Sequence, residues 1–283
     1  MLNFFVILSV SSIVIQNCVF NNICKKELKT NDDIYRFNMI VYTVCIALFG
    51  IFLFGEKISL YTIAFGVLFG IVTALGNQYK MLSLSNGPMH ITLLITTSSM
   101  IIPTMSGIFF GESFSIQKFC IVFILIGFIY LSLGKNNNTE INKRWFLYCS
   151  IAFVLMGSIG VLQKIHQTSI HKNELNAFLF VSFICSFIFS KIRIKEKSKN
   201  SELNKKSIAL AIVCGFCTYS MNFLNLKLSG MLPSQLFFPL INGSAIILSS
   251  FMSVIIFKEK LSKKQLIGLC GGILSLIAIC IVK

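Results

Sequence analysis

A pattern of apolar and small polar residues occurs twice along this chain of 283 residues. Residues 70–110 can be laid on the segment that starts at position 215 with a constant shift of 145. Identical residues then coincide at Gly70/Gly215, Thr73/Thr218, Asn77/Asn222, Pro88/Pro233 and Ser99/Ser244. The next helix repeats with a shift of 147, which brings Phe110, Glu112 and Ser115 onto Phe257, Glu259 and Ser262. Two copies of an apolar multi-helix unit are typical of secondary transporters, which bind substrate between the repeats.

The composition is that of a membrane protein. The chain is 55% hydrophobic and 12% charged, with a mean hydropathy of +0.81, whereas a soluble protein carries roughly 25% charged residues. Apolar stretches of about 20 residues, long enough to span a bilayer, recur throughout. The first one, Met1–Phe20, has no basic n-region, and the polar Gln16, Asn17 and Cys18 follow its apolar run, so we interpret it as a membrane helix and not as a signal peptide.

The periodicity predicts an all-α integral membrane protein with ten transmembrane helices. Their expected bounds are 2–22, 34–54, 59–82, 87–110, 116–134, 144–164, 174–190, 206–228, 233–257 and 264–282. Residues 1–134 form a first five-helix repeat, residues 135–143 a polar linker, and residues 144–283 a second repeat. An odd number of helices in each repeat means that the two copies are inverted relative to each other in the membrane.

The net charge of +15 agrees with this topology. The basic residues lie in short loops, so we expect anionic lipid headgroups, and not nucleic acid, as their partner. On the predicted topology the two sides of the membrane hold 19 and 6 of the 25 basic residues. The positive-inside rule then places both termini outside the cytoplasm.

Polar side chains follow the predicted third, fourth, eighth and ninth helices. His90, Thr97 and Thr104 are spaced by seven on the fourth helix, and their counterparts on the ninth are Gln235, Asn242 and Ser249. Asn77 and Lys80 share a face of the third helix, and the eighth carries Tyr219, Asn222 and Asn225. Such stripes either line a cavity between the halves or hydrogen-bond one helix to the next.

Two ionisable side chains have alternative interpretations. Lys80 either extends to the membrane interface or provides a counter-charge for an anionic substrate. His90 is either a hydrogen-bonded residue at a helix start or a proton-coupling group. All ten carboxylates lie in loops or at helix ends, which disfavours a carboxylate-coupled antiporter.

Motifs of enzymes are missing from the sequence, including a nucleophile elbow, HExxH, a P-loop and a dinucleotide fingerprint. Most of the ten cysteines lie inside apolar spans, and the single CxxC at Cys214 has no second ligand pair. We therefore expect no enzymatic activity, no cofactor and no metal.

Two short segments carry a family resemblance. Phe109–Ser115 (FFGESFS) and Phe257–Ser262 (FKEKLS) each precede an apolar helix, and both resemble the terminal element of the EamA family in the drug/metabolite transporter superfamily. The second copy departs from the family in having Lys258 at the glycine position. The resemblance implies alternating access around a cavity lined by the third, fourth, eighth and ninth helices. It also implies cytoplasmic termini, in conflict with the charge count.

Together these observations favour a plasma-membrane permease that moves a small polar metabolite, such as an amino acid or a related compound. The residues expected to bind substrate are Asn77, Lys80, His90, Thr97, Tyr219, Asn222, Asn225, Gln235 and Asn242. The expected partners are a small-molecule substrate and the lipid bilayer, with the chain a monomer or a homodimer. The main alternative is a non-transporting membrane receptor or scaffold, which has no need of a polar stripe in both halves.

Overall fold

The structure, a computed structural model, describes residues 2–28, 30–53, 55–56, 58–87, 89–113, 115–132, 143–194, 203–257 and 263–282. Within these ranges the regular elements are all helices. They are α1 (Leu2–Lys26), α2 (Asn31–Ile51), α3 (Leu60–Asn86), α4 (Met89–Ser98), α5 (Ile101–Ser106), the 3₁₀-helix η1 (Gly107–Phe110), α6 (Ile116–Ser132), α7 (Lys143–Thr168), α8 (Leu175–Arg193), α9 (Lys205–Met231), α10 (Ser234–Phe257) and α11 (Lys263–Ile281).

Membrane-spanning capacity is distributed unevenly among these helices. Six of them are long and apolar enough to cross a membrane, namely α1, α2, α3, α7, α8 and α9. The other four predicted spans correspond to shorter apolar helices within the described residues: Ile95–Phe110, Ile116–Leu131, Ser234–Ser249 and Leu266–Ile281. Over the described residues the chain is therefore an all-helical, multi-pass membrane protein, and the count of ten spans stays a prediction.

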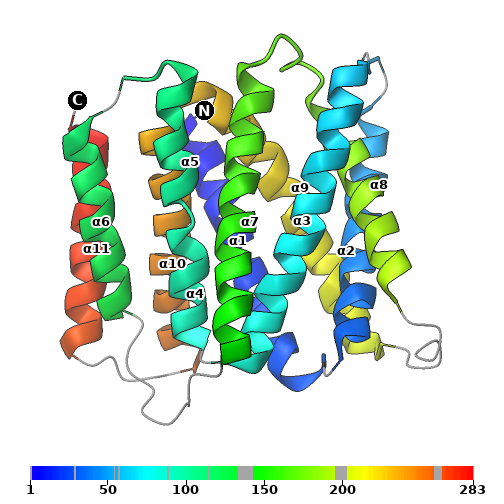
Figure 1. Cartoon of the computed structure of the whole chain (residues 1–283). Coiled ribbons are helices and arrows are strands. Elements are labelled where there is room, and N and C mark those ends of the chain that lie inside the picture. The colour runs from blue at the N-terminus through cyan, green and yellow to red at the C-terminus, as the bar shows by residue number, and fades with distance from the viewer. Residues whose placement is uncertain are drawn as a thin grey trace.

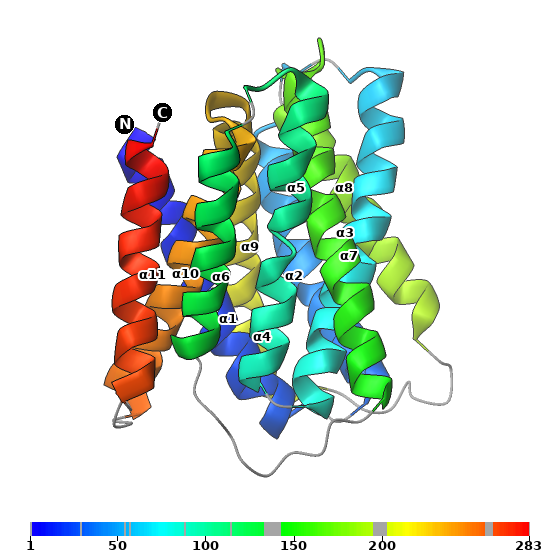
Figure 2. The same cartoon turned by 60° about the vertical axis from the view of Figure 1, so that its left-hand side comes forward.

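The helices pack in two layers (Figures 1 and 2). In the front layer of Figure 1 the neighbours are α6, α4 with α5, α7, α3 and α8. Behind it the neighbours are α11, α10, α1, α9 and α2. Both termini lie at the same end of the bundle. Each layer combines helices from both halves of the chain, so the two halves are interleaved and not placed side by side.

Local sequence explains where the long helices begin. The Thr30 and Asp33 side chains form a capping box at the start of α2, which satisfies amide groups that have no partner within the helix. Ser59 accepts a hydrogen bond from the Thr62 amide at the start of α3, and Asn204 accepts one from Ser207 at the start of α9. These caps fix the first turns of the two helices that approach the centre of the bundle.

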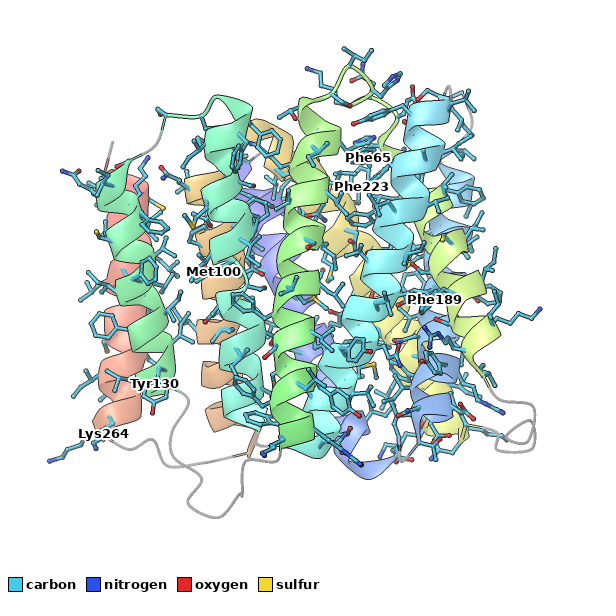
Figure 3. The ribbon with its side chains drawn as sticks, in the orientation of Figure 1. Phe65, Met100, Tyr130, Phe189, Phe223 and Lys264 are labelled. Atoms are coloured by element: carbon cyan, nitrogen blue, oxygen red, sulfur yellow. The ribbon has the colours of Figure 1, made fainter. Side chains whose placement is uncertain are left out.

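The helix predicted over residues 87–110 is broken in its middle. It consists of α4, a turn at Ser99 and Met100, then α5 and η1, and Met100 lies at this break (Figure 3). Pro103 has no amide hydrogen, and its ring crowds the carbonyl of the residue four positions earlier, which is Ser99. Pro239 lies inside α10 without interrupting it.

Apolar side chains make two buried clusters with polar residues between them. One cluster joins α2, α3, α8 and α9, and contains Phe69, Phe178 and Phe183. The other joins α1, α6, α10 and α11, and contains Leu125 and Phe237. Large apolar side chains on the outside are exposed, among them Leu60, Ile116 and Leu274. An outer surface of this kind fits contact with lipid tails.

Candidate substrate cavity

A cavity of about 150 Å³, called here the central cavity, lies between the two layers. Helices α1, α3, α4, α5, α7, α9 and α10 all contribute to its wall. Its polar lining residues are Gln16, Asn17, Thr73, Asn77, Lys80, Thr96, Thr97, Ser99, Gln163, Thr218, Asn222, Asn225 and Asn242. Apolar side chains complete the wall, including Met100, Met156, Phe237 and Phe238. Polar and apolar residues thus contribute to the wall in nearly equal numbers, which suits a small polar molecule.

The lining follows the sequence repeat. Under the shift of 145, Thr73 corresponds to Thr218, Asn77 to Asn222, Lys80 to Asn225 and Thr97 to Asn242, and all eight of these residues line the cavity. Each half thus contributes a threonine and an asparagine at matched positions. The other two matched positions differ in chemistry. Lys80 and Thr97 of the first half correspond to Asn225 and Asn242 of the second half.

Of the nine residues expected to bind substrate, six line the central cavity: Asn77, Lys80, Thr97, Asn222, Asn225 and Asn242. Tyr219 and Gln235 lie elsewhere, as described below. His90 belongs to α4, but its side chain lies outside the part of the chain that the structure describes. The structure therefore brings together the asparagines of α3, α9 and α10 with Thr97 and Lys80.

Tyr219 belongs to a cluster of aromatic rings. Its ring centroid lies 4.5 Å from that of Phe49 and 6.2 Å from that of Phe223. The side chain of Gln235 bonds the backbone before α6, accepting a hydrogen bond from the Ser115 amide at 3.0 Å and donating one to the Ser115 carbonyl at 3.4 Å. Gln235 is in the first turn of α10, and its side chain is held at the backbone of Ser115 instead of lining the cavity.

Three polar lining residues that the sequence analysis did not predict come from α1 and α7. These are Gln16, Asn17 and Gln163. A signal for two of them exists in the sequence, because Gln16 and Gln163 correspond under the shift of 147 that relates the later helices. The repeat thus extends into the first helix of each half, beyond the segments in which its identities are dense.

The two halves of the cavity differ in their hydrogen bonds. The Gln16 amide donates to the Thr218 hydroxyl at 2.7 Å, and that hydroxyl donates to the Cys214 carbonyl at 2.7 Å. The equivalent Thr73 hydroxyl is buried and has no partner among the described residues. A buried hydroxyl without a partner costs about 1–3 kcal/mol, so Thr73 is less well satisfied than Thr218.

Lys80 is the one charged residue in the lining. Its ammonium group donates to the Asn17 side-chain oxygen at 3.1 Å and lies 5.7 Å from the centre of the Phe20 ring. Lys227, which has a similar depth on α9, is exposed and lies over Phe5 instead. The described lining contains no carboxylate, so the fixed charge of the central cavity is positive.

Carboxylates lie at the ends of the bundle, where each bonds the start of another helix. Glu174 accepts hydrogen bonds from the Ser59 amide at 2.9 Å and its hydroxyl at 2.8 Å, at the N-cap of α3. Glu27 accepts one from Asn204, the N-cap of α9. Under the shift of 147, Glu27 corresponds to Glu174. The two central helices are therefore anchored in equivalent ways at opposite ends of the bundle (Figure 1).

The Glu174 carboxyl has a lowered pKa of about 2. Desolvation by burial raises this pKa, but hydrogen bonds from Thr62, Ser59 and His171 lower it by more. The His171 ring nitrogen Nδ1 lies 2.9 Å from the carboxylate. Glu174 is thus ionised at neutral pH and stabilised at a helix start.

Glu112 makes a buried ion pair. Its carboxylate lies 2.5 Å from the Lys164 ammonium and accepts a hydrogen bond from the Ser234 amide at 2.6 Å. Lys164 also donates to the carbonyls of Ser229 and Leu232. Glu112 therefore stabilises the start of α10, and not of the helix that follows it in sequence. Its repeat counterpart, Glu259, lies outside the described residues.

Comparison with known proteins adds the family. Residues 143–281 match the EamA-like transporter family. This half of the chain belongs to the EamA-like transporter family. The matched segment is the second half, which carries α7 to α11. Members of this family are membrane transporters, so the chain is a membrane transporter of the drug/metabolite superfamily. None of the curated proteins matches the chain in sequence.

A solved structure described as "Crystal structure of protein" has the same fold as this EamA-like chain. The two superpose with a TM-score of 0.70 at 12% sequence identity, over 99% of each chain. At this identity the likeness concerns the fold alone. It covers both halves, including residues 1–142, which precede the family match.

Proposed function

We propose that this EamA-like protein is a plasma-membrane permease that binds a small polar metabolite in the central cavity and moves it by alternating access. On this proposal its ten spans form two inverted repeats, residues 1–134 and 144–283, joined by residues 135–143. The chain works as a monomer or a homodimer. An amino acid or a related compound has the right size and polarity.

The observation that carries the proposal is the symmetric polar lining of a cavity between two interleaved layers. Asn77 and Asn222 occupy equivalent positions on α3 and α9. The contacts of these helices are also exchanged by the repeat, since α3 packs on α7 and α8 while α9 packs on α1 and α2. A transporter with inverted repeats needs this arrangement, because each half must perform at one side of the membrane what the other performs at the opposite side.

The packing of glycines supports the same symmetry. Gly70 of α3 approaches Ser182 and Cys185 of α8, and Gly215 of α9 approaches Val44 of α2. Helices that pack closely through small residues can move as rigid units. Pairs of helices from different halves then form units that rotate around the cavity.

The cavity also limits the substrate. A volume of about 150 Å³ is that of a cavity that holds benzene, about six non-hydrogen atoms. Drug-sized ligands need about 300–1,000 Å³. A small metabolite therefore fits, whereas a nucleotide or a lipid does not fit this conformation.

Binding is tested by thermal stabilisation of the purified full-length protein with a panel of amino acids, organic acids, nucleosides, sugars and organic cations. A compound that raises Tm is then measured with Asn222→Ala and Asn242→Ala. Thr43→Val, an exposed site on α2, is the matched control. We expect both alanine variants to lose most of the shift in Tm while the control keeps it. A shift unaffected by either variant places the site outside the central cavity.

Transport is tested separately, in proteoliposomes loaded with the stabilising compound. Exchange of external labelled compound for the internal pool is expected with the wild-type protein, and a greatly reduced rate with Asn222→Ala. A compound that binds in the cavity but is not exchanged in either direction contradicts transport and supports the receptor alternative.

A further inference from the structure

Two asparagines in the wall of the central cavity have a bonded amide nitrogen and an unbonded amide oxygen. The Asn222 nitrogen donates to the Thr218 carbonyl at 2.8 Å, and the Asn242 nitrogen donates to the Phe238 carbonyl at 3.0 Å. A backbone carbonyl only accepts, so the group beside it must be the NH2 group of each amide. The orientation of both amides is therefore fixed, and each presents its oxygen on the side away from its own helix carbonyl.

A third amide, that of Gln16, is fixed in the same sense through Thr218. The Thr218 hydroxyl donates its single hydrogen to the Cys214 carbonyl at 2.7 Å. It can then only accept from Gln16, whose amide nitrogen lies 2.7 Å away. The Gln16 oxygen is consequently the unbonded end of this amide. Gln16 and Asn222 bond the hydroxyl and the carbonyl of one residue, Thr218, so their two amides are adjacent.

These three oxygens are accessible from the central cavity. Among the described residues no group donates to them, and unlike the Thr73 hydroxyl they are not enclosed by protein atoms. All three side chains line the cavity. They come from α1, α9 and α10, which are neighbours behind the front layer of Figure 1. This wall of the cavity therefore presents hydrogen-bond acceptors that need donors from a solute or from water.

The same wall presents donors beside the acceptors. The Asn17 oxygen accepts from the Lys80 ammonium, which only donates, so the hydrogens of the Asn17 amide are left for another acceptor. The Asn225 oxygen accepts from the Ser9 hydroxyl, which leaves the Asn225 amide hydrogens in the same state. Both asparagines line the cavity, and Asn225 follows Asn222 by about 4.5 Å along α9.

This inference rests on the proposed function and names the group by which its substrate is recognised. We propose that the substrate is a small primary amine whose ammonium group is bound by the amide oxygens of Gln16 and Asn222, with that of Asn242 as the third acceptor. An oxygen on the adjacent carbon of the substrate accepts from the amides of Asn17 or Asn225. An ammonium group has three N–H donors and no acceptor, so it suits a wall of oxygens that cannot donate. Its charge strengthens each of these hydrogen bonds.

Other groups suit the three oxygens less well. A hydroxyl has one hydrogen, so it satisfies one amide oxygen and turns its own oxygen toward the others. A carboxylate has no hydrogen to donate, and its negative charge is repelled by the partial charges of the amide oxygens. An apolar group displaces water from the oxygens and returns no hydrogen bond.

The test uses matched triples of equal size on the full-length protein in nanodiscs. Alanine, lactate and isobutyrate carry an ammonium, a hydroxyl or a methyl group at one carbon, and ethanolamine, ethylene glycol and 1-propanol form the same series without a carboxylate. Calorimetry is expected to give about tenfold tighter binding for the amine than for either analogue in at least one triple. The triple that shows it identifies the second group as carboxylate or hydroxyl. Equal or weaker binding of both amines, or no binding by either of them, overturns the inference.

Variants test the assigned oxygens. Asn222→Leu and Asn242→Leu remove the oxygen and break only a side-chain bond to a carbonyl of the same helix. Each is expected to weaken binding of the preferred amine about tenfold and to change its methyl analogue little. Thr43→Val is the control, because it also removes a bond to the carbonyl four residues earlier, at an exposed site. Equal losses for the amine and the methyl analogue, or amine binding unchanged in both leucine variants, overturn the assignment.

The outcomes separate this inference from the proposed function. If proteoliposomes exchange a carboxylate that has no amine, at a rate that Asn222→Leu reduces, the substrate class is wrong and transport through the cavity stands. If an amine binds as expected although the wild-type protein exchanges no solute, transport is wrong and the assigned site stands.

Discussion

Gly70 of α3 lies directly against the backbone of Ser182 in α8. A Cβ atom at Gly70 would be 2.3 Å from the Ser182 carbonyl oxygen, and Ser186 in the next turn donates to the Gly70 carbonyl at 2.8 Å. The same arrangement recurs in the other half, where Gly215 lies against Val44 and Cys45 donates to its carbonyl at 3.5 Å. Of the helices that line the cavity, α3 and α9 are therefore both held through a glycine.

This contact predicts different outcomes for alanine at the two glycines. Gly70→Ala forces two backbones apart, so we expect a loss of about 3 kcal/mol or more. Gly215→Ala meets the Val44 Cβ at 2.6 Å and its two methyl groups at 2.9 and 3.0 Å, so Val44→Ala, which removes only the methyl groups, should restore part of its stability. Thermal unfolding in detergent measures both. Gly127→Ala, where nothing lies within 4 Å, is the neutral control, and an unaltered Tm in Gly70→Ala contradicts the close contact.

The Glu174 carboxylate predicts a loss of stability in acid. Its folded pKa of about 2 is below the ordinary value of 4.5, so its ionised form stabilises the folded state. That contribution is fully present above about pH 4.5 and is lost as the pH falls toward 2. Wild type and Glu174→Gln should therefore differ most in Tm at neutral pH and converge in acid.

His171 provides the control for this pH dependence, because its ring lies beside the Glu174 carboxylate. When His171→Gln is introduced into both the wild type and Glu174→Gln, the Tm values of the two proteins should still converge in acid. A difference in Tm that stays constant from pH 7 to 3 shows that the carboxylate charge contributes nothing to folding.

The sequence repeat predicted much of the lining of the central cavity. Small polar side chains within long apolar helices usually face the protein interior, and here they occur at matched positions of the two halves. Asn77 and Asn222 were found in this way. Gln16 and Gln163 were not, since the first helices of the two halves share few identities and show no clear polar stripe. Their role depends on which helices cross at the centre, and single-sequence periodicity does not report that.

Tyr219 and Gln235 are the converse case, because both were predicted to line the cavity and neither does. Both lie on helices that line the cavity, and both share a face with residues that do so. The aromatic cluster of Phe49 and Phe223 holds Tyr219, and the backbone of Ser115 holds Gln235. Helical spacing gives the face of a residue, but the neighbouring element decides whether that face meets the cavity or another chain segment.

The bond between Gln16 and Thr218 predicts a measurable coupling between α1 and α9. Interhelical hydrogen bonds in membrane proteins contribute about 0.6 kcal/mol on average and about 1.7 kcal/mol at most. A double-mutant cycle of Gln16→Leu and Thr218→Val, read by unfolding free energy, should give a coupling in this range. The equivalent cycle of Gln163→Leu and Thr73→Val should give almost none in the absence of substrate, and a larger coupling in the second cycle than in the first contradicts the observed asymmetry.

The ion pair of Lys164 and Glu112 predicts non-additive effects of mutation. Lys164→Met leaves Glu112 charged and largely buried, with exposed side-chain fractions of 6% and 16% for the two partners. Removing one partner of a buried pair costs about 3–5 kcal/mol. The double variant Lys164→Met/Glu112→Gln should recover part of this loss, because the neutral amide can still accept the hydrogen bond from the Ser234 amide. Unfolding free energies of the two single variants and the double variant show whether the double variant recovers stability relative to Lys164→Met. If the double variant is less stable than Lys164→Met alone, Glu112 stabilises α10 by a route that does not depend on Lys164.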